Sequence, residues 1–133
     1  KIAEDKKKDL IVIDGPPGIG CPVISAITGV DLVLIVTEPT LSGIKDLERI
    51  IDVAAHFEIP ALVCINKYDI NKENSERIEN YCKEKQVKII GQLPYDTTIT
   101  KALIEEKNII EYAPDSDISK KIVNMWNAIE KEV

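Results

Sequence analysis

The sequence predicts one α/β domain over residues 1–133, with a mostly parallel sheet of about four strands flanked by helices. Short apolar runs rich in β-branched residues, typical of strands buried on both faces, alternate with longer segments of helical periodicity. A strand–helix–strand order pairs consecutive strands in parallel through right-handed crossovers. We therefore expect the loops that follow the strands to meet at one edge of the sheet.

The apolar runs give the expected strands. The first run, Leu10-Ile11-Val12-Ile13, ends at Asp14 and follows a charged stretch, residues 1–8, that we expect to be a linker or the end of a helix. Because ligands of open α/β sheets bind beyond the carboxyl ends of the strands, Asp14 should lie where a ligand is met. The four expected strands are residues 9–13, 32–36, 61–65 and 87–93.

The segments between these runs predict helices that cover the sheet. A short apolar helix begins at Pro22 and ends at Gly29, residue types that favour a helix start and a helix end. Apolar residues recur at helical spacing over 41–57, with charged residues between them. A more polar helix is expected over 72–85.

The carboxyl-terminal region predicts a short helix, a linker and a last helix. Thr97 or Thr98 can cap the short helix, which closes an α/β core expected to span 9–112. A linker over 108–114 leads to a terminal helix within 115–133. One face of that helix should pack on the core through Ile118, Ile122, Met125, Trp126 and Ile129.

Composition excludes several classes of function. A net charge of −6 argues against a nucleic-acid-binding surface, because phosphate contacts need clustered Lys and Arg. No apolar run is long enough to span a membrane and no signal-peptide pattern occurs, so we expect a soluble, cytoplasmic protein. The three cysteines, Cys21, Cys64 and Cys82, form no C-x-x-C pair, and reduced thiols are expected.

The loop after the first run, Asp14-Gly15-Pro16-Pro17-Gly18, carries the most suggestive chemistry. A carboxylate at a strand end beside glycine amides suits a metal ion bound to phosphate. The other interpretation is that Asp14 only caps the next helix and the glycines only make a turn.

Four motifs at successive strand ends give the sequence a family resemblance. They are Asp14-Gly15-Pro16-Pro17-Gly18, Thr37-Glu38-Pro39-Thr40, Asn66-Lys67-Tyr68-Asp69 and Gly91-Gln92-Leu93-Pro94-Tyr95-Asp96. In this order they resemble the MinD/ParA/Mrp-type P-loop ATPases, to which the nitrogenase iron protein is related. The closest likeness is to the ferredoxin-containing MinD-superfamily ATPases. The resemblance covers about residues 9–112 and implies half of a Rossmann-like P-loop NTPase fold.

The resemblance implies ATP and Mg²⁺ as ligands. In such proteins Asp14 would hold Mg²⁺ through water, and the Gly18 amide, next to Pro17, would sense the γ-phosphate. Asn66 would contact the base from a loop that also contains Lys67 and Asp69. The other wall of the purine pocket would consist of Leu93, Pro94, Tyr95 and Asp96.

GTP is the competing nucleotide. Asn66-Lys67-Tyr68-Asp69 has the form of the NKxD element of GTPases, in which the aspartate accepts hydrogen bonds from the guanine edge. Two features favour adenine. Three residues separate Asp14 from Gly18 where the common GTPase element has two, and residues 91–96 resemble the ATPase branch.

Cys21 raises the question of an iron–sulfur cluster. It lies seven positions after Asp14, and the nitrogenase iron protein has a cluster ligand at the corresponding spacing. A [4Fe–4S] cluster takes four thiolates, and Cys21 is alone on the expected rim, so the further ligands and a redox or iron–sulfur protein partner would come from elsewhere. The other interpretation is a small thiol at the start of a helix.

The phosphate-binding element of the family is missing. No G-x-x-x-x-G-K-[ST] pattern occurs, so we expect this chain to be the carboxyl-terminal part of a longer ATPase and to be inactive by itself. In this family the strand that leads into the phosphate loop lies beside the Asp14 strand, so its absence should leave an apolar sheet edge prone to self-pairing, and we expect a homodimer. A GTPase fragment and a non-catalytic flavodoxin- or receiver-like binding module are the alternatives.

Overall fold

The computed structural model describes residues 9–18 and 20–133. Three parallel strands alternate with helices, which confirms the α/β fold class. The elements are α2 (Cys21–Ile27), β1 (Val33–Thr37), α3 (Leu41–His56), β2 (Ala61–Asn66), η1 (Tyr68–Ile70), α4 (Lys72–Glu84), β3 (Lys88–Leu93), α5 (Thr97–Ile104), α6 (Ile109–Tyr112) and α7 (Asp117–Glu130).

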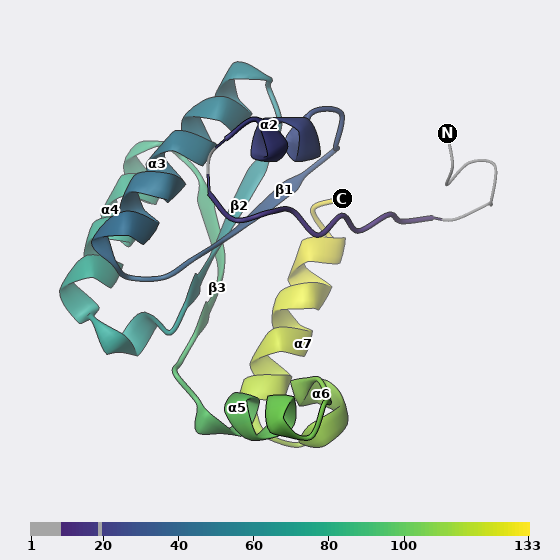
Figure 1. Ribbon diagram of the computed structural model, residues 1–133. Coiled ribbons are helices and arrows are strands. Elements are labelled where there is room, and N and C mark those ends of the chain that lie inside the picture. The colour runs from purple at the N-terminus through teal and green to yellow at the C-terminus, as the bar shows by residue number, and fades with distance from the viewer. Residues whose placement is uncertain (1–8, 19) are drawn as a thin grey trace.

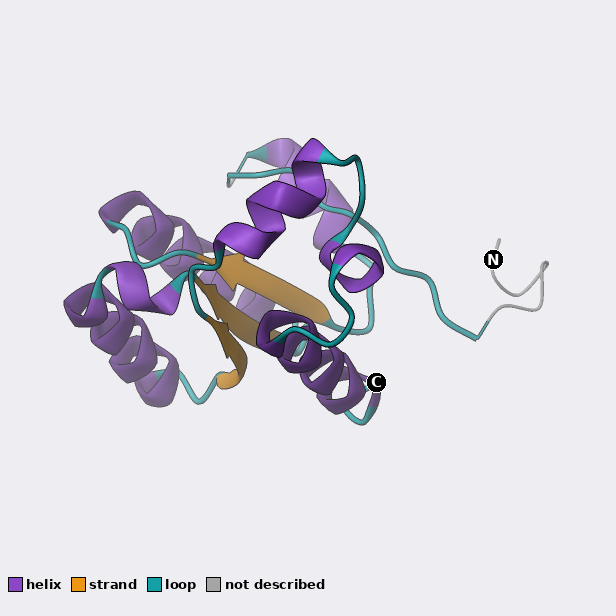
Figure 2. Cartoon of the chain, turned by 90° about the horizontal axis from the view of Figure 1, so that it is seen from below, coloured by secondary structure: helices purple, strands orange, loops and turns teal. Residues whose placement is uncertain are grey.

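The sheet has the strand order β1-β2-β3, with every pair parallel. Helices α3 and α4 cover one face and α7 covers the other, as Figures 1 and 2 show. The central strand separates two cores: Val63 and Ile65 join the cluster under α3 and α4, and Cys64 joins the cluster that includes Ile118 of α7. This alternation is the two-residue period of a strand buried on both faces.

Polar side chains fix where the helices at the carboxyl ends of the strands begin. Thr40 accepts a hydrogen bond from the Gly43 amide at the start of α3, Asn71 from Asn74 at the start of α4, and Asp96 from Thr98 at the start of α5. Such caps satisfy amides that have no partner inside the helix. Each loop that leaves the sheet therefore ends at a defined residue.

Strand β3 contains an extra residue opposite β2. Val63 pairs with Ile89 and Cys64 with Gly91, so Ile90 bulges from the ladder. A side chain at Gly91 would place its Cβ 2.7 Å from the Met125 sulfur of α7. Glycine thus allows α7 to approach the strand closely.

The predicted strand at 9–13 is wrong. Leu10, Ile11, Val12 and Ile13 are 44–73% exposed and form no strand, so the sheet of the described residues has three strands instead of about four. In Figure 1 it runs as a coil toward the N-terminus. An apolar run becomes a strand only when a neighbouring backbone completes its hydrogen bonds, and none of the described strands pairs with this one. The expectation for residues 1–8 lies outside the described residues.

Two further expectations at the carboxyl end are corrected. The predicted linker over 108–114 contains helix α6, because the Asn108 side chain accepts a hydrogen bond from the Glu111 amide and caps one helical turn. The terminal helix is present as α7, but Trp126 is 38% exposed, whereas Ile118 and Ile129 are buried. Among the described residues, no helix is both long and apolar enough to cross a membrane.

The two buried thiols give a first prediction. Cys64 and Cys82 are buried, and burial raises the pKa of each to about 11, whereas Cys21 is exposed. Because the thiolate is the reactive form, Ellman's reagent at neutral pH should modify one thiol in the folded chain and all three in guanidinium. Rapid modification of more than one thiol in the folded chain would contradict this packing.

The same burial predicts a pH dependence of stability. Above the ordinary thiol pKa of 9.0, unfolded chains lose these protons while the folded chain keeps them up to about pH 11. The free energy of unfolding should therefore fall in this range, by up to about 1.4 kcal/mol per pH unit for each thiol. Urea unfolding at pH 8, 9 and 10 measures the slope. A Cys64→Ala/Cys82→Ala variant should have a shallower slope, and an equal slope would refute this assignment.

Candidate functional site

Three loops meet at the carboxyl ends of the strands. They are residues 37–40 after β1, 66–71 after β2 and 93–96 after β3, all at the end of the sheet from which the chain enters α3, α4 and α5 (Figure 1). Parallel pairing places them side by side, because the three strands point the same way. We call residues 37–40, 66–71 and 93–96 the rim.

The loop after β1 is packed tightly against the start of α3. The Thr37 hydroxyl is 3.2 Å from the Gly43 carbonyl oxygen and donates to it, and the Gly43 amide donates to the Thr40 hydroxyl at 3.0 Å. A Cβ on Gly43 would collide with the Glu38 carbonyl oxygen. Only glycine fits against this backbone.

The loop after β2 contacts the loop after β1 through side chains. The Lys67 Nζ lies 3.2 Å from Glu38 Oε1, and the Asn74 side-chain amide donates to the Pro39 carbonyl at 3.1 Å. Lys67 has a φ of 53°, a left-handed backbone that turns the chain sharply after Asn66. The ion pair is partly exposed and contributes at most about 1 kcal/mol, so its role is to set geometry.

The loop after β3 contacts the loop after β2. The Tyr95 amide donates to Asp69 Oδ1 at 2.8 Å, and the Thr98 amide donates to Asp96 Oδ1 at 2.8 Å. Hydrogen bonds from the Thr98 side chain and backbone lower the pKa of Asp96. Leu93 is buried below this loop, while the Tyr95 ring is exposed. The loop is thus held from both sides.

The structure brings together seven of the residues expected in a nucleotide site and leaves three apart. On the rim lie Asn66, Lys67, Asp69, Leu93, Pro94, Tyr95 and Asp96. Asp14, Pro17 and Gly18 lie in the unpaired segment before α2, and none of the hydrogen bonds among the described residues involves 9–18. The expected meeting of all four loops at the sheet edge is therefore wrong for the first of them, because its strand does not form.

Cys21 is exposed at the first turn of α2. Within residues 9–18 and 20–133, no group of three or more His, Cys, Asp or Glu side chains is arranged to hold a metal ion. The described part of the chain thus offers Cys21 as a single thiol, with Cys64 and Cys82 buried elsewhere.

Sequence reasoning missed how the rim is tied together. Asn74 lies outside the four motifs but contacts the Pro39 carbonyl, and Glu38 lies within one of them and pairs with Lys67. The opposite charges of Glu38 and Lys67, which follow adjacent strands, could have predicted this ion pair from the sequence. Asn74 gives no such signal, because it reaches Pro39 from 35 residues away.

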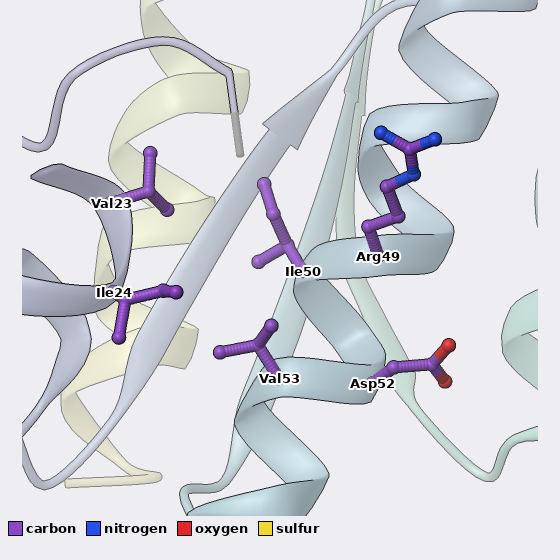
Figure 3. Close-up of a pocket in the computed structure, with 6 residues that line it drawn as sticks. All are labelled: Val23, Ile24, Arg49, Ile50, Asp52 and Val53. Carbon is purple, nitrogen blue, oxygen red and sulfur yellow. The ribbon is translucent and has the colours of Figure 1, made fainter. Parts of the chain in front are cut away.

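A separate cavity of about 320 Å³ lies between α2 and α3. Figure 3 shows the apolar side chains of Val23 and Ile24 facing Ile50 and Val53, with Arg49 and Asp52 pointing away from them. The cavity contains none of the residues expected to bind nucleotide. It is a gap between two helices and is not part of the rim.

Comparison with known proteins identifies relatives over nearly the whole chain. Residues 3–130 match the family model ParA, described as NUBPL iron-transfer P-loop NTPase. The chain is 33% identical over 129 residues to an uncharacterized protein, MJ0578, of Methanocaldococcus jannaschii, and the match covers 97% of this chain and 42% of that protein.

Two solved structures are similar. The cell division ATPase MinD of Pyrococcus furiosus has a TM-score of 0.77 and 26% identity, covering 96% of this chain and 54% of that one. The septum site-determining protein MinD of Pyrococcus horikoshii, complexed with Mg-ADP, has a TM-score of 0.81 and 22% identity, covering 98% and 54%. The chain spans about half the length of the proteins that it matches.

The close approach of Gly43 to the rim gives a second prediction. Gly43→Ala should lower the free energy of unfolding by about 2 kcal/mol, although alanine favours helix by about 1 kcal/mol, because the new Cβ meets the Glu38 backbone. Gly91→Ala is the matched control: its Cβ meets the flexible Met125 side chain, and we expect a loss below about 1 kcal/mol. Urea unfolding measures both. Equal stabilities of the two variants would show that the 37–40 loop is not held as described.

Proposed function

Because the chain belongs to the ParA family of P-loop NTPases, we propose that it is the carboxyl-terminal half of an ATP-binding and ATP-hydrolysing switch protein of MinD/ParA type. The observation that carries the proposal is the rim, where seven residues expected in a nucleotide site lie on loops held by hydrogen bonds and an ion pair. The proposal concerns the longer protein, since the chain spans about half the length of its relatives.

The rim would supply the base pocket. Asn66 is the last residue of β2 and pairs with Leu93, the last residue of β3. The Asn66 side chain and the 93–96 loop are therefore at the ends of adjacent strands. A side-chain amide both donates and accepts hydrogen bonds, which suits the edge of adenine. Tyr95, with its exposed ring, and Pro94 would form the wall facing Asn66.

The segment before α2 would face the phosphates. An exposed carboxylate such as Asp14 is the ligand type that Mg²⁺ prefers, and it would hold the ion through water. Gly18, with a φ of 90°, presents a backbone amide without a side chain, which would contact the γ-phosphate beside Pro17. The Mg-ADP of the Pyrococcus horikoshii protein supports ATP and Mg²⁺ as the ligands. Bound Mg²⁺ would neutralise charge on the transferred phosphoryl group.

The phosphate cradle would come from outside this chain. The sequence contains no G-x-x-x-x-G-K-[ST] element, which provides the amides, the lysine and the hydroxyl of a P-loop.

We place the parent protein in the cytoplasm. A link to iron–sulfur chemistry is supported by the iron-transfer description of the family and by the exposed thiol of Cys21, which would need further thiolates from outside the chain.

Hydrolysis measurements test the proposal. The full-length protein that contains this chain should hydrolyse ATP with Mg²⁺, and Asp14→Asn should lower kcat about 10- to 100-fold, the usual effect of removing an outer-shell metal ligand. Asp9→Asn, in the same exposed segment, is the control and should retain activity. The 133-residue chain by itself should show no turnover. Mg²⁺-dependent turnover by that chain, or an inactive parent, would refute the proposal.

We also propose that the chain self-associates through the free edge of β1. Within the described residues this strand pairs only with β2, and the run over residues 10–13 is exposed and apolar. Sedimentation of the 133-residue chain should show a dimer that Val36→Lys weakens, because Val36 of β1 is 60% exposed. Leu103→Lys is the matched control, since Leu103 is 68% exposed on α5, away from that edge. A monomer at millimolar concentration would rule the dimer out.

A further inference from the structure

The Asp69 side chain ends on the backbone of a different loop. Its Oδ1 accepts a hydrogen bond of 2.8 Å from the amide of Tyr95, which lies 26 residues later. The last paired residues of β2 and β3 are Asn66 and Leu93, so this contact continues the pairing of the two strands beyond the sheet. Among the hydrogen bonds of the described residues, it is the one that holds the Tyr95 amide.

Lys67 contacts the loop on the other side of β2, which is the loop after β1. After Asn66, the left-handed backbone at Lys67 turns the chain, and the ammonium group lies 3.2 Å from Glu38 Oε1. Since β2 is the central strand, Lys67 and Asp69 connect its loop to the loops on its two sides. The two charged residues of the Asn-Lys-x-Asp pattern both contact protein.

This geometry distinguishes two uses of the pattern. An aspartate that reads guanine directs its carboxylate oxygens at N–H groups of the base, whereas Oδ1 of Asp69 is directed at the Tyr95 amide of its own chain. We propose that Asp69 is a positioning residue that fixes the 93–96 loop as a wall of the base pocket, and that it does not select guanine. The inference rests on the proposed nucleotide-binding function and assigns the role of one residue within it.

The 93–96 loop has little else to hold its centre. Leu93 is buried at one end, and Asp96 caps α5 at the other, where its carboxylate accepts from the Thr98 amide. Between these anchors the Tyr95 ring is exposed. Loss of the Asp69 contact would leave the loop tethered only at its two ends, so the wall opposite Asn66 would lose a fixed position.

Two substitutions separate the roles. Asp69→Asn keeps a side-chain oxygen that can accept from Tyr95, but removes the carboxylate that guanine reading needs. Asp69→Ala removes both. Asp31→Ala, an exposed aspartate before β1, is the control for loss of one negative charge.

In the 133-residue chain, amide hydrogen exchange measured by NMR tests the contact directly. The Tyr95 amide should exchange about five-fold faster in Asp69→Ala and near the wild-type rate in Asp69→Asn and Asp31→Ala. Unchanged exchange in Asp69→Ala would overturn the positioning role, whether or not any nucleotide binds.

In the full-length protein, nucleotide affinities test the consequence. Asp69→Ala should weaken ATP binding about three- to ten-fold, and Asp69→Asn should restore it to near the wild-type value. Xanthosine triphosphate carries a carbonyl where guanine carries an amino group, so a base-reading Asp69 would make Asp69→Asn lose GTP and gain xanthosine triphosphate. Such a switch of nucleotide preference from GTP to xanthosine triphosphate would overturn the inference. If the wild-type protein binds neither ATP nor GTP, the proposed function fails, while the exchange experiment still decides the role of Asp69.

Discussion

The pairing of the buried strand β2 with β1 and β3 is the interaction on which the rest of the structure depends. Leu62, Val63, Cys64 and Ile65 are at most 4% exposed, and they contribute to a core on each face of the sheet. Parallel pairing requires helical crossovers, which cover these faces and turn all three carboxyl ends the same way. The position of the rim therefore follows from how one apolar strand is buried.

The rim itself is held by weaker forces than the core. The contacts of Glu38 with Lys67 and of Asp69 with Tyr95 are exposed, and such contacts contribute about 1 kcal/mol or less each, against several kcal/mol for burying the core side chains. Substitutions at the rim should therefore alter loop geometry more than global stability. Capped helices and the tight turn at Gly43 compensate by fixing where each loop ends.

Periodicity predicted most of the fold, since α3, α4 and the strands β1, β2 and β3 lie where apolar spacing placed them. It failed at residues 9–13, because an apolar run reports a preference for burial and not the presence of a partner strand. It missed α6, which is too short to show a helical period. The convergence of seven site residues was predictable from strand order, whereas the Asp69–Tyr95 contact depends on two loops whose backbones only the folded chain defines.

The two sides of the proposed nucleotide site differ in how the chain holds them. On the proposed base side, Asn66 ends β2 next to Leu93 of β3, and the Asp69–Tyr95 hydrogen bond joins the loops that follow these two strands. The phosphate side, Asp14 to Gly18, has no such ties and follows a run that pairs with none of the described strands. A strand beside residues 10–13 would order that run and the loop after it together. In the proposed site, base recognition would thus rest on this chain's own fold, whereas the placement of Asp14 and Gly18 for phosphate chemistry would need an additional neighbouring strand.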